Sequence, residues 1–235
     1  MKAMILAAGR GERLRPLTDR SPKPLLAVGG KPLLAWHLQA LAQAGLREVL
    51  INHAHLGQML IDFFGDGAAY GLHITWSAEP PGALETAGGI RQALPALGDA
   101  AFLVVNGDIH CDWDFAAAEA LAARLNHSGD LAHLVMVDNP PQHPEGDFVL
   151  ADGRLRATAG PETARLTFSG IGVYAPALFA GLEVGVAAKL APLLVAAMSA
   201  GRVSGELHCG AWHDIGTAER LAALDAQLRA DYNRP

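Results

Sequence analysis

The sequence predicts an α/β fold in which helices cover both faces of a mostly parallel sheet. Three observations lead to this prediction. Short apolar runs alternate with helix-like segments through the first half of the chain, the pattern of repeated β-α-β units. A glycine-rich loop follows the first apolar run directly. The second half departs from this alternation and contains Asp152-Gly153, a strong hairpin turn signal.

The apolar runs of the first half are short enough to be buried strands. They are Ala3–Ala8, Val49–Asn52, His73–Trp76 and Phe102–Asn106. Between them, helices are expected over Pro32–Ala44, Leu56–Phe64 and Thr86–Leu97. Pro32 suits the first turn of its helix, and the leucines of that helix recur on one face.

The expected elements become more mixed after about residue 110. Helices are predicted over Asp114–Leu125, Lys189–Ala200 and Thr217–Arg229, the last with Thr217 as its N-cap. Strands are predicted over Leu131–Val137, Phe148–Ala151, Leu155–Ala157 and Phe168–Tyr174. Because no repeat or low-complexity linker divides the chain, we predict one domain, residues 1–235, with residues 1–110 and 111–235 as its two halves.

The composition is that of a globular protein, with 51% hydrophobic and 18% charged residues among 235. No apolar run approaches the ~18 residues that a membrane-spanning helix needs, and the N-terminal run is too short for a signal peptide. Two cysteines, Cys111 and Cys209, do not make a disulfide framework and are expected to be free thiols. We therefore expect a cytoplasmic chain without a membrane partner, either a monomer or a small homo-oligomer.

The net charge of −6 is unevenly distributed. Residues 1–31 hold seven Lys or Arg against two acidic residues, a net +5, so the remaining residues sum to −11. A basic island on an acidic body attracts a small polyanion, whereas nucleic acid would need a broad basic face and is not expected as a partner. The alternative is a solvated basic loop.

The loop Gly9-Arg-Gly-Glu-Arg13 is a candidate phosphate cradle. Its glycines let backbone N–H groups approach phosphate oxygens without an obstructing Cβ, and Arg13 and Arg15 add charge. A P-loop is excluded by the glycine spacing, and a dinucleotide fingerprint would need glycine where Leu14 stands.

Lys23 strengthens the phosphate hypothesis. It lies between Pro22 and Pro24, and a residue before proline is biased toward extended backbone. The ammonium is therefore presented from a stiffened segment, which suits stabilisation of charge that develops on phosphorus. The alternative is a proline-rich surface turn with an idle lysine.

Two aspartates are candidate ligands of Mg²⁺, which prefers carboxylates, waters and phosphate oxygens. Asp108 follows an apolar strand and a glycine, and Asp214 precedes the last predicted helix. They are 106 positions apart, and spacing alone does not bring them together. Ordinary turn chemistry is the alternative for each.

Other chemistries are disfavoured. Among ten histidines only His53 and His55 form a close pair, with no partner at the spacing of metal ligands, so a transition-metal site is not expected. No serine lies in a nucleophile elbow, which argues against acyl transfer.

These motifs together resemble the signature of the sugar-1-phosphate nucleotidyltransferases. The resemblance covers nearly the whole chain and is carried by Leu6–Thr18, Ser21–Pro24, Leu84–Gly89, Val105–Asp108 and Trp212–Thr217. It implies the nucleotide-diphospho-sugar transferase fold, a Rossmann-like α/β/α sandwich with a small sugar-binding sub-region. It also implies a Mg²⁺-dependent reaction of a nucleoside triphosphate with a sugar-1-phosphate, releasing pyrophosphate.

The resemblance also assigns roles to individual residues. The nucleotide would be held by Ala8, Gly9, Gly11, Glu12, Arg13, Lys23, Glu79, Glu85 and Thr86. Lys23, Arg13 and Asp108 would be catalytic, and Asp108 and Asp214 would hold the metal. The sugar would contact Asn106, Gly146, Asp147, Ser169 and Lys189.

Further segments, such as Ile51–Gln58 and Lys189–Leu194, are most similar to one branch of the family, the bacterial uridylyltransferases that act on N-acetylmuramate α-1-phosphate in peptidoglycan recycling. UTP and that sugar phosphate are the substrates that this branch implies. The alternatives are another sugar-1-phosphate (glucose or mannose), phosphocholine, or a non-catalytic nucleotide-binding regulatory subunit. Many relatives carry a Glu-Lys pair where this chain has Glu162 and Arg165, and several have Gln at the position of Glu79.

Overall fold

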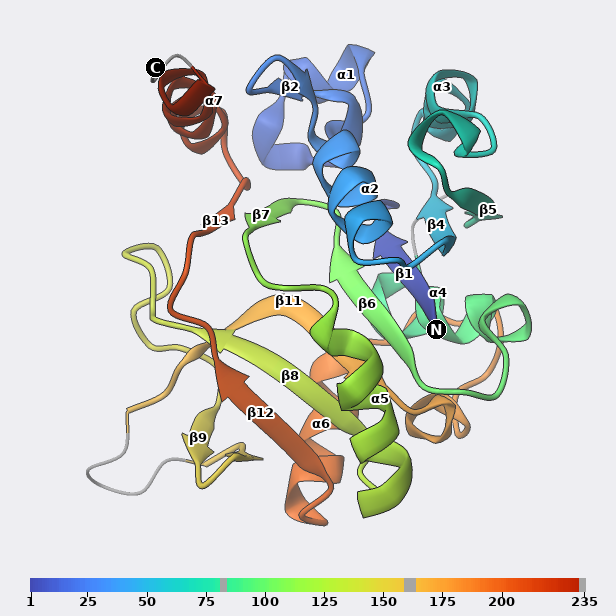
Figure 1. The fold of residues 1–235 in the computed structure, drawn as a ribbon, viewed down its shortest axis with the longest axis vertical. Coiled ribbons are helices and arrows are strands. Elements are labelled where there is room, and N and C mark those ends of the chain that lie inside the picture. The colour runs from blue at the N-terminus through green and yellow to red at the C-terminus, as the bar shows by residue number, and fades with distance from the viewer. Residues whose placement is uncertain (81–83, 159–163, 233–235) are drawn as a thin grey trace.

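The computed structural model describes residues 1–80, 84–158 and 164–232. Its N-terminal half is a parallel sheet of β1 (Lys2–Leu6), β4 (Glu48–His53), β5 (His73–Ala78) and β6 (Phe102–Asn106), in the order β5-β4-β1-β6 (Figure 1). All four strands were predicted from their apolar runs. The chain builds the sheet outward from β1 to β5 and then returns to place β6 on the other side of β1. Ligands bind at such a reversal of strand order in open parallel sheets.

The sheet continues into the second half of the chain. β11 (Thr167–Tyr174) pairs antiparallel with both β6 and β8 (Ala132–Val137), and β12 (Val203–Leu207) runs parallel to β8. The edge is a hairpin of β9 (Val149–Ala151) and β10 (Arg154–Arg156). The prediction of a turn at Asp152-Gly153 is confirmed, because both residues have positive φ, 51° and 70°, as a tight hairpin requires.

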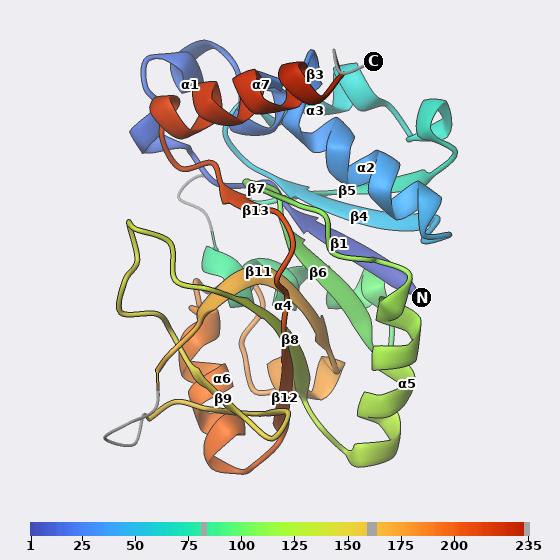
Figure 2. The ribbon, with the colours of Figure 1, turned by 60° about the vertical axis from the view of Figure 1, so that its left-hand side comes forward.

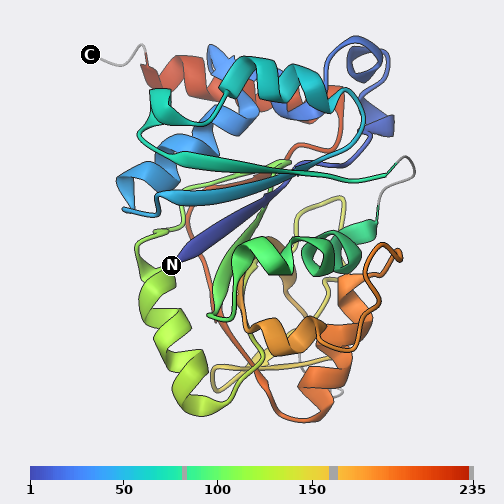
Figure 3. The same cartoon turned by 90° about the vertical axis from the view of Figure 1, so that its right-hand side faces the viewer.

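Helices cover both faces, which makes the predicted three-layer sandwich. α2 (Leu33–Gln43), α3 (Gly57–Phe64) and α5 (Ala117–Ser128) bury their apolar side chains in one core cluster with the strands. On the opposite face, α4 (Glu85–Leu97) and α6 (Leu190–Ser199) share a second cluster. Figure 3 shows α4 under the parallel strands and α2 and α3 above them.

The N-terminal loop is followed by short elements that precede α2. They are η1 (Glu12–Leu14), α1 (Leu17–Arg20), η2 (Lys23–Leu25), β2 (Ala27–Val28) and β3 (Lys31–Pro32). Two further single turns, η3 (Ala68–Tyr70) and η4 (Pro176–Phe179), lie elsewhere in the chain.

The C-terminal helix α7 (Ala218–Tyr232) returns to these N-terminal elements (Figure 2). Its Leu221 and Leu224 are buried against Val28 and Leu33. The carboxylate of Asp225 accepts the Gly29 backbone N–H at 2.8 Å. The predicted N-cap is confirmed, since Thr217 Oγ1 accepts the backbone N–H three residues on.

A two-stranded ladder links the beginning of the second half to the end of the chain. β7 (Ile109–Cys111) pairs antiparallel with β13 (Trp212–Asp214). Neither strand was predicted, and β12 was also missed, because strands this short and this polar lack the apolar periodicity that marks the others. Among the described residues no helix has the length and apolar character needed to cross a membrane.

Candidate active site

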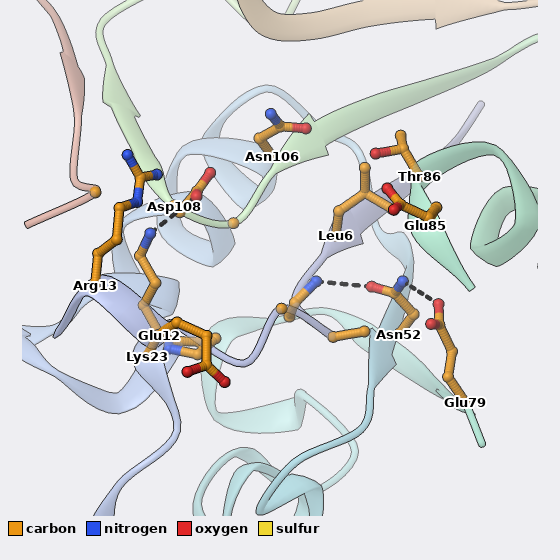
Figure 4. Close-up of a pocket in the computed structure, with 17 residues that line it drawn as sticks. Leu6, Glu12, Arg13, Lys23, Asn52, Glu79, Glu85, Thr86, Asn106 and Asp108 are labelled. Carbon is orange, nitrogen blue, oxygen red and sulfur yellow. Dashed lines mark hydrogen bonds and ion pairs between the residues drawn. The ribbon is translucent and has the colours of Figure 1, made fainter. Parts of the chain in front are cut away.

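The carboxyl ends of the parallel strands open into a cavity of about 470 Å³ (Figure 4). Its volume lies within the range of small-molecule sites. Each parallel strand contributes a residue at or next to its carboxyl end, namely Leu6, Asn52, Glu79 and Asn106. The remaining lining residues come from the glycine loop, the Lys23 segment, the start of α4, and the turns after β6 and β13: Ala7, Ala8, Gly9, Gly11, Glu12, Arg13, Lys23, Pro24, Glu85, Thr86, Gly107, Asp108 and Gly216. Every residue predicted to bind nucleotide is therefore among them.

The glycine loop is folded tightly at Gly11. Gly11 has φ of +69°, and a Cβ there would stand 2.9 Å from Thr18 Cγ2, so a larger residue would be strained and would clash. The buried Thr18 donates its hydroxyl hydrogen to the Gly11 carbonyl at 2.9 Å. The loop is thus held in one shape from within.

The arginines of this loop divide into two roles. Arg10 donates to the Thr18 carbonyl and pairs with Asp19, and Arg15 pairs with Glu12 and Asp19. Their charges are therefore balanced locally. Arg13 has no ion pair within the described part of the chain, and its side chain lies on the same side of the cavity as Lys23 and Asp108. Of the two arginines predicted to add charge for a phosphate, Arg13 is the one that stays available.

Lys23 forms an ion pair with Asp108, which is 85 positions away in the sequence. The Lys23 Nζ donates to Asp108 Oδ2 at 2.8 Å, and the lysine side chain is only 10% exposed while that of Asp108 is 42% exposed. The expectation of extended backbone at Lys23 is wrong: it begins the 3₁₀ turn η2. Two hydrogen bonds, Leu25 N–H to the Pro22 carbonyl and Leu26 N–H to the Lys23 carbonyl, hold the turn and outweigh the bias before proline.

The β7–β13 ladder brings the second aspartate beside the first. Asp214 pairs with Ile109 in that ladder, and the Ile215 N–H donates to the Asp108 carbonyl at 2.9 Å. The Asp214 carboxylate forms an ion pair with the Arg220 guanidinium from the first turn of α7. Both predicted metal ligands are thus neighbours in the fold, and each carboxylate already faces one cationic side chain.

A second guanidinium therefore reaches the edge of the cavity. A Cβ on Gly216 would lie 2.5 Å from one Arg220 terminal nitrogen and 2.9 Å from one Arg13 terminal nitrogen, so Gly216 separates the two groups and must stay small. Arg13 lines the cavity and has no ion pair among the described residues, whereas Lys23 and Arg220 are paired with Asp108 and Asp214. Arg13, Lys23 and the glycine loop are therefore the lining groups that suit a polyphosphate. Arg220 was missed in the sequence because nothing in its spacing links it to the glycine loop.

Asn52 is a second residue that sequence reasoning missed. It is 3% exposed, accepts the Ala7 N–H at 2.7 Å and donates to Glu79 Oε1 at 2.6 Å. The other Glu79 oxygen accepts the Leu84 N–H at 2.9 Å. The carboxylate of Glu79, predicted to face a base, is therefore held by protein groups and ties β4, β5 and the start of α4 to the glycine-loop strand.

Asn52→Ala is expected to destabilise the fold. The substitution leaves a buried N–H on Ala7 and a buried oxygen on Glu79 without partners, each at a cost of about 1–3 kcal/mol. Together they cost about 2–6 kcal/mol, which at roughly 2–4 °C per kcal/mol for a chain of this size lowers Tm by at least about 4 °C. Thermal unfolding checks this, with the exposed Asn126→Ala on α5 as the control. Equal Tm values for both variants would contradict the assigned network.

The start of α4 is also closely packed against this network. Glu85 has φ of 58°, an unusual backbone for a residue other than glycine, and it lines the cavity with Thr86. A Cβ on Gly89 would lie 2.3 Å from Glu79 Oε1, so only glycine lets the helix approach the carboxylate. Ala188 accepts the N–H groups of Ala87 and Gly88, which ties this helix start to the segment before α6.

The residues predicted to contact a sugar are not gathered in the same way. Asn106 lines the cavity, and a Cβ on Gly170 would lie 2.6 Å from its amide, which places the β11 bulge against it. Ser169 is buried and its Oγ accepts the Ile171 N–H. Lys189 is exposed at the N-cap position of α6, beside the α4 start but outside the cavity lining.

Gly146 and Asp147 belong to a clamp that closes the 139–147 loop on β11. The Asp147 carboxylate accepts the Phe168 N–H at 2.8 Å and lies 3.1 Å from His143 Nε2. Gly146 has φ of +59° and packs on Asn139. Neither residue lines the cavity. Glu162 lies outside the described residues.

Comparison with known proteins agrees with this geometry. The model of the nucleotidyl transferase family matches residues 2–149. The chain belongs to the nucleotidyl transferase family. It is 56% identical over 227 residues to the N-acetylmuramate α-1-phosphate uridylyltransferase of Neisseria meningitidis, covering 96% of this chain and 97% of that one. The protein of the same description from Caulobacter vibrioides is 34% identical, with 96% of each chain covered.

A solved structure supports the fold. A putative glucose-1-phosphate thymidylyltransferase from Bacillus anthracis, crystallised with sucrose, superimposes with a TM-score of 0.82 over 97% of this chain and 95% of that one. Its sequence identity is 22%, so the fold is what this likeness establishes. The sequence-based assignment to the nucleotidyltransferase family and to its α/β/α fold is confirmed.

Proposed function

We propose that this nucleotidyl transferase moves the uridylyl group of UTP to N-acetylmuramate α-1-phosphate, forming UDP-N-acetylmuramate and pyrophosphate. The observation that carries the proposal is the 56% identity to the Neisseria uridylyltransferase over nearly the full length of both chains. The cavity supplies the chemical support, because its glycine loop and the side chains of Arg13 and Lys23 suit a triphosphate.

The reaction needs positioning and charge neutralisation more than proton transfer. The nucleophile is a phosphate oxygen of the sugar phosphate, which is already anionic near neutral pH and needs no general base. It attacks the α-phosphorus of UTP in line, and the bond from that phosphorus to the α–β bridging oxygen breaks. Pyrophosphate leaves with the bonding electron pair, and no covalent enzyme intermediate forms. Both reactants are polyanions, so the barrier is lowered mainly by cations fixed beforehand.

The cavity residues have distinct parts in this step. The Gly9–Arg13 loop and the Arg13 guanidinium would hold the departing pyrophosphate, since they are the free donors at that mouth. Lys23 would neutralise charge at the α-phosphorus. Its side chain is nearly buried and its ammonium is positioned by Asp108, so little reorganisation is needed at the moment of reaction.

The two aspartates fit a Mg²⁺ ion. They supply carboxylate oxygens, the ligands that Mg²⁺ prefers, and both face a cation in this structure, Lys23 or Arg220. When bound there, Mg²⁺ would neutralise phosphate oxygens of both reactants. Asp108 and Asp214 would hold it, with their strands fixed by the β7–β13 ladder.

Arg220→Gln is expected to lower the Mg²⁺ concentration needed for half-maximal activity, by up to about five-fold. The Arg220 charge competes with a metal for Asp214, and a partly exposed pair of this kind is worth ~1 kcal/mol at most. Metal titration of pyrophosphate release measures this. Arg229→Gln, which breaks an exposed pair with Asp225 on the same helix, is the matched control. A requirement that stays the same or rises would contradict the competition.

The acceptor sugar is the less constrained part of the proposal. N-acetylmuramate carries a lactyl carboxylate, for which Lys189, Arg165 and Arg202 are the candidate cations of the second half. The carbonyl of Ala188, the residue before Lys189, accepts two N–H groups at the start of α4, so Lys189 lies beside this cavity-lining helix start. The guanidinium of Arg165 donates to the Ala157 carbonyl, and that of Arg202, just before β12, donates to the Gly129 carbonyl. Lys189 is therefore the favoured partner. Lys189→Ala should weaken use of the muramate phosphate more than that of the glucosamine phosphate, and equal losses on both would remove this role.

Two other functions stay as alternatives. Another sugar-1-phosphate, such as that of glucose or mannose, or phosphocholine would use the same nucleotide side of the cavity. A regulatory nucleotide-binding subunit could dispense with Lys23 and the two aspartates. Lys23 and Asp108 line the cavity and Asp214 lies next to Asp108 in the fold, which favours an enzyme.

A pyrophosphate-release panel tests the substrate assignment. Four nucleoside triphosphates are each combined with muramate, glucosamine, glucose and mannose 1-phosphates. We expect the highest kcat/KM for UTP with N-acetylmuramate α-1-phosphate. A higher kcat/KM with another pair would replace the proposed substrates and leave the family intact.

A further inference from the structure

A second cluster of metal-ligating groups lies outside the active-site cavity. One donor atom each of Cys111, Asp112 and His208 lie within 4.8 Å of one another, and His208 Nε2 is 2.8 Å from Asp112 Oδ1. None of the three lines the cavity. Cys111 ends β7, Asp112 follows it, and His208 directly follows β12. His208 is almost 100 positions away from the adjacent Cys111 and Asp112, so no motif spacing revealed the three together.

The backbone holds these donors together independently of their side chains. Asp112 N–H donates to the Ala211 carbonyl at 3.1 Å, and Trp212 pairs with Cys111 in the β7–β13 ladder. His208 is fixed by its own N–H, which donates to the Met136 carbonyl at 2.8 Å. A Cβ on Gly210 would lie 2.3 Å from Asp112 Oδ1, so this loop can fold over the cluster only with glycine there.

The donor set selects the class of ion. Sulfur, imidazole nitrogen and a single carboxylate oxygen are ligands of Zn²⁺, whereas Mg²⁺ prefers oxygen ligands alone. Zinc–ligand bonds of about 2.0–2.3 Å place tetrahedral ligands roughly 3.3–3.8 Å apart. Donors that already lie within 4.8 Å need only small side-chain movements to reach that geometry.

The cluster is also accessible to an ion from solvent. Cys111 is half-buried, the His208 side chain is 14% exposed and that of Asp112 is 56% exposed. Burial raises the pKa of the Cys111 thiol to about 11, so a bound ion has to displace its proton.

We propose that Cys111, Asp112 and His208 bind a thiophilic divalent ion such as Zn²⁺, with water completing the coordination. The ion would cross-link β7 to the segment that enters β13. Asp108 directly precedes β7 and Asp214 ends β13, both at the end of the ladder away from Cys111, so the site would brace the ladder that holds these two carboxylates in place. It is chemically distinct from a Mg²⁺ site on those two carboxylates, and the proposal does not depend on the substrate assignment.

Titration of the metal-free whole chain with Co²⁺, in the presence of excess Mg²⁺, tests the site. Co²⁺ takes the place of Zn²⁺ and gives a thiolate-to-metal absorption band only when sulfur is a ligand. We expect such a band, saturating near one Co²⁺ per chain and bleached by added Zn²⁺. No oxygen-only site can produce this signal.

Three variants separate the proposed ligands from other thiols. Cys111→Ser should abolish the band, His208→Gln should weaken Co²⁺ binding by about ten-fold or more, and Cys209→Ser is the matched control that should keep the band. Far-UV circular dichroism and Tm identify any variant that fails to fold, and in that case Asp112→Asn, at the most exposed ligand, replaces it. Absence of the band in the wild type, or a band that depends on Cys209 and not on Cys111, would overturn the proposal.

Discussion

Lys23→Ala is expected to lower turnover by about 10²-fold or more, on the scale of losing one preorganised electrostatic contact. Its side chain is 10% exposed and its ammonium lies 2.8 Å from Asp108, so its charge acts from a fixed place. The loss should fall mainly on kcat, because the amine is assigned to charge that develops at the reacting phosphorus. Steady-state pyrophosphate release measures it.

The control for this variant is a lysine outside the cavity. Lys2 is exposed at the start of β1, and Lys2→Ala should leave turnover within about two-fold. A folded Lys23→Ala variant whose turnover also stays within a few-fold of the wild type would remove Lys23 from the reaction.

Asp108→Ala is expected to have an effect of similar or larger size. The substitution removes one of the two carboxylates assigned to Mg²⁺ and also takes away the partner that aims Lys23. We expect turnover to fall by roughly 10²-fold or more. Because the two side chains act as a pair, the double variant Lys23→Ala/Asp108→Ala should lose much less than the product of the single effects.

Kinetics of the two single variants and the double variant, with Asp62→Ala on the exposed surface of α3 as the control, provide the measurement. Effects that multiply in the double variant would show that Lys23 and Asp108 act independently, against the contact in the structure. Near-normal pyrophosphate release by folded Asp108→Ala would remove the metal assignment.

The parallel half of the fold and one mouth of the cavity were predictable from the sequence. Apolar runs in the sequence predict buried strands such as Phe102–Asn106, and the glycine loop follows the first of these strands. Once a parallel sheet is predicted, the carboxyl ends of its strands define where a ligand binds. The glycine loop and the turn containing Asp108 then fall at one edge of the sheet without further information.

What could not be predicted are contacts made across long sequence separations. The β7–β13 ladder is three residues long on each strand, too short to show a periodic pattern, yet it brings Asp214 beside Asp108. Asn52 looks like the polar end of an apolar strand, and only the fold shows that it holds Glu79. Lys23 turned out to stand on a hydrogen-bonded 3₁₀ turn because local hydrogen bonds outweighed the backbone bias of proline.

The most direct test of the central claim is pyrophosphate release from UTP by the purified chain under three conditions. These are the complete mixture with Mg²⁺ and N-acetylmuramate α-1-phosphate, the mixture without the sugar phosphate, and the mixture with the metal chelated. We expect release only in the complete mixture, because direct attack needs both an acceptor and neutralised phosphates. Release that continues undiminished without the acceptor or without the metal would contradict this expectation, as would no release from UTP with any sugar-1-phosphate.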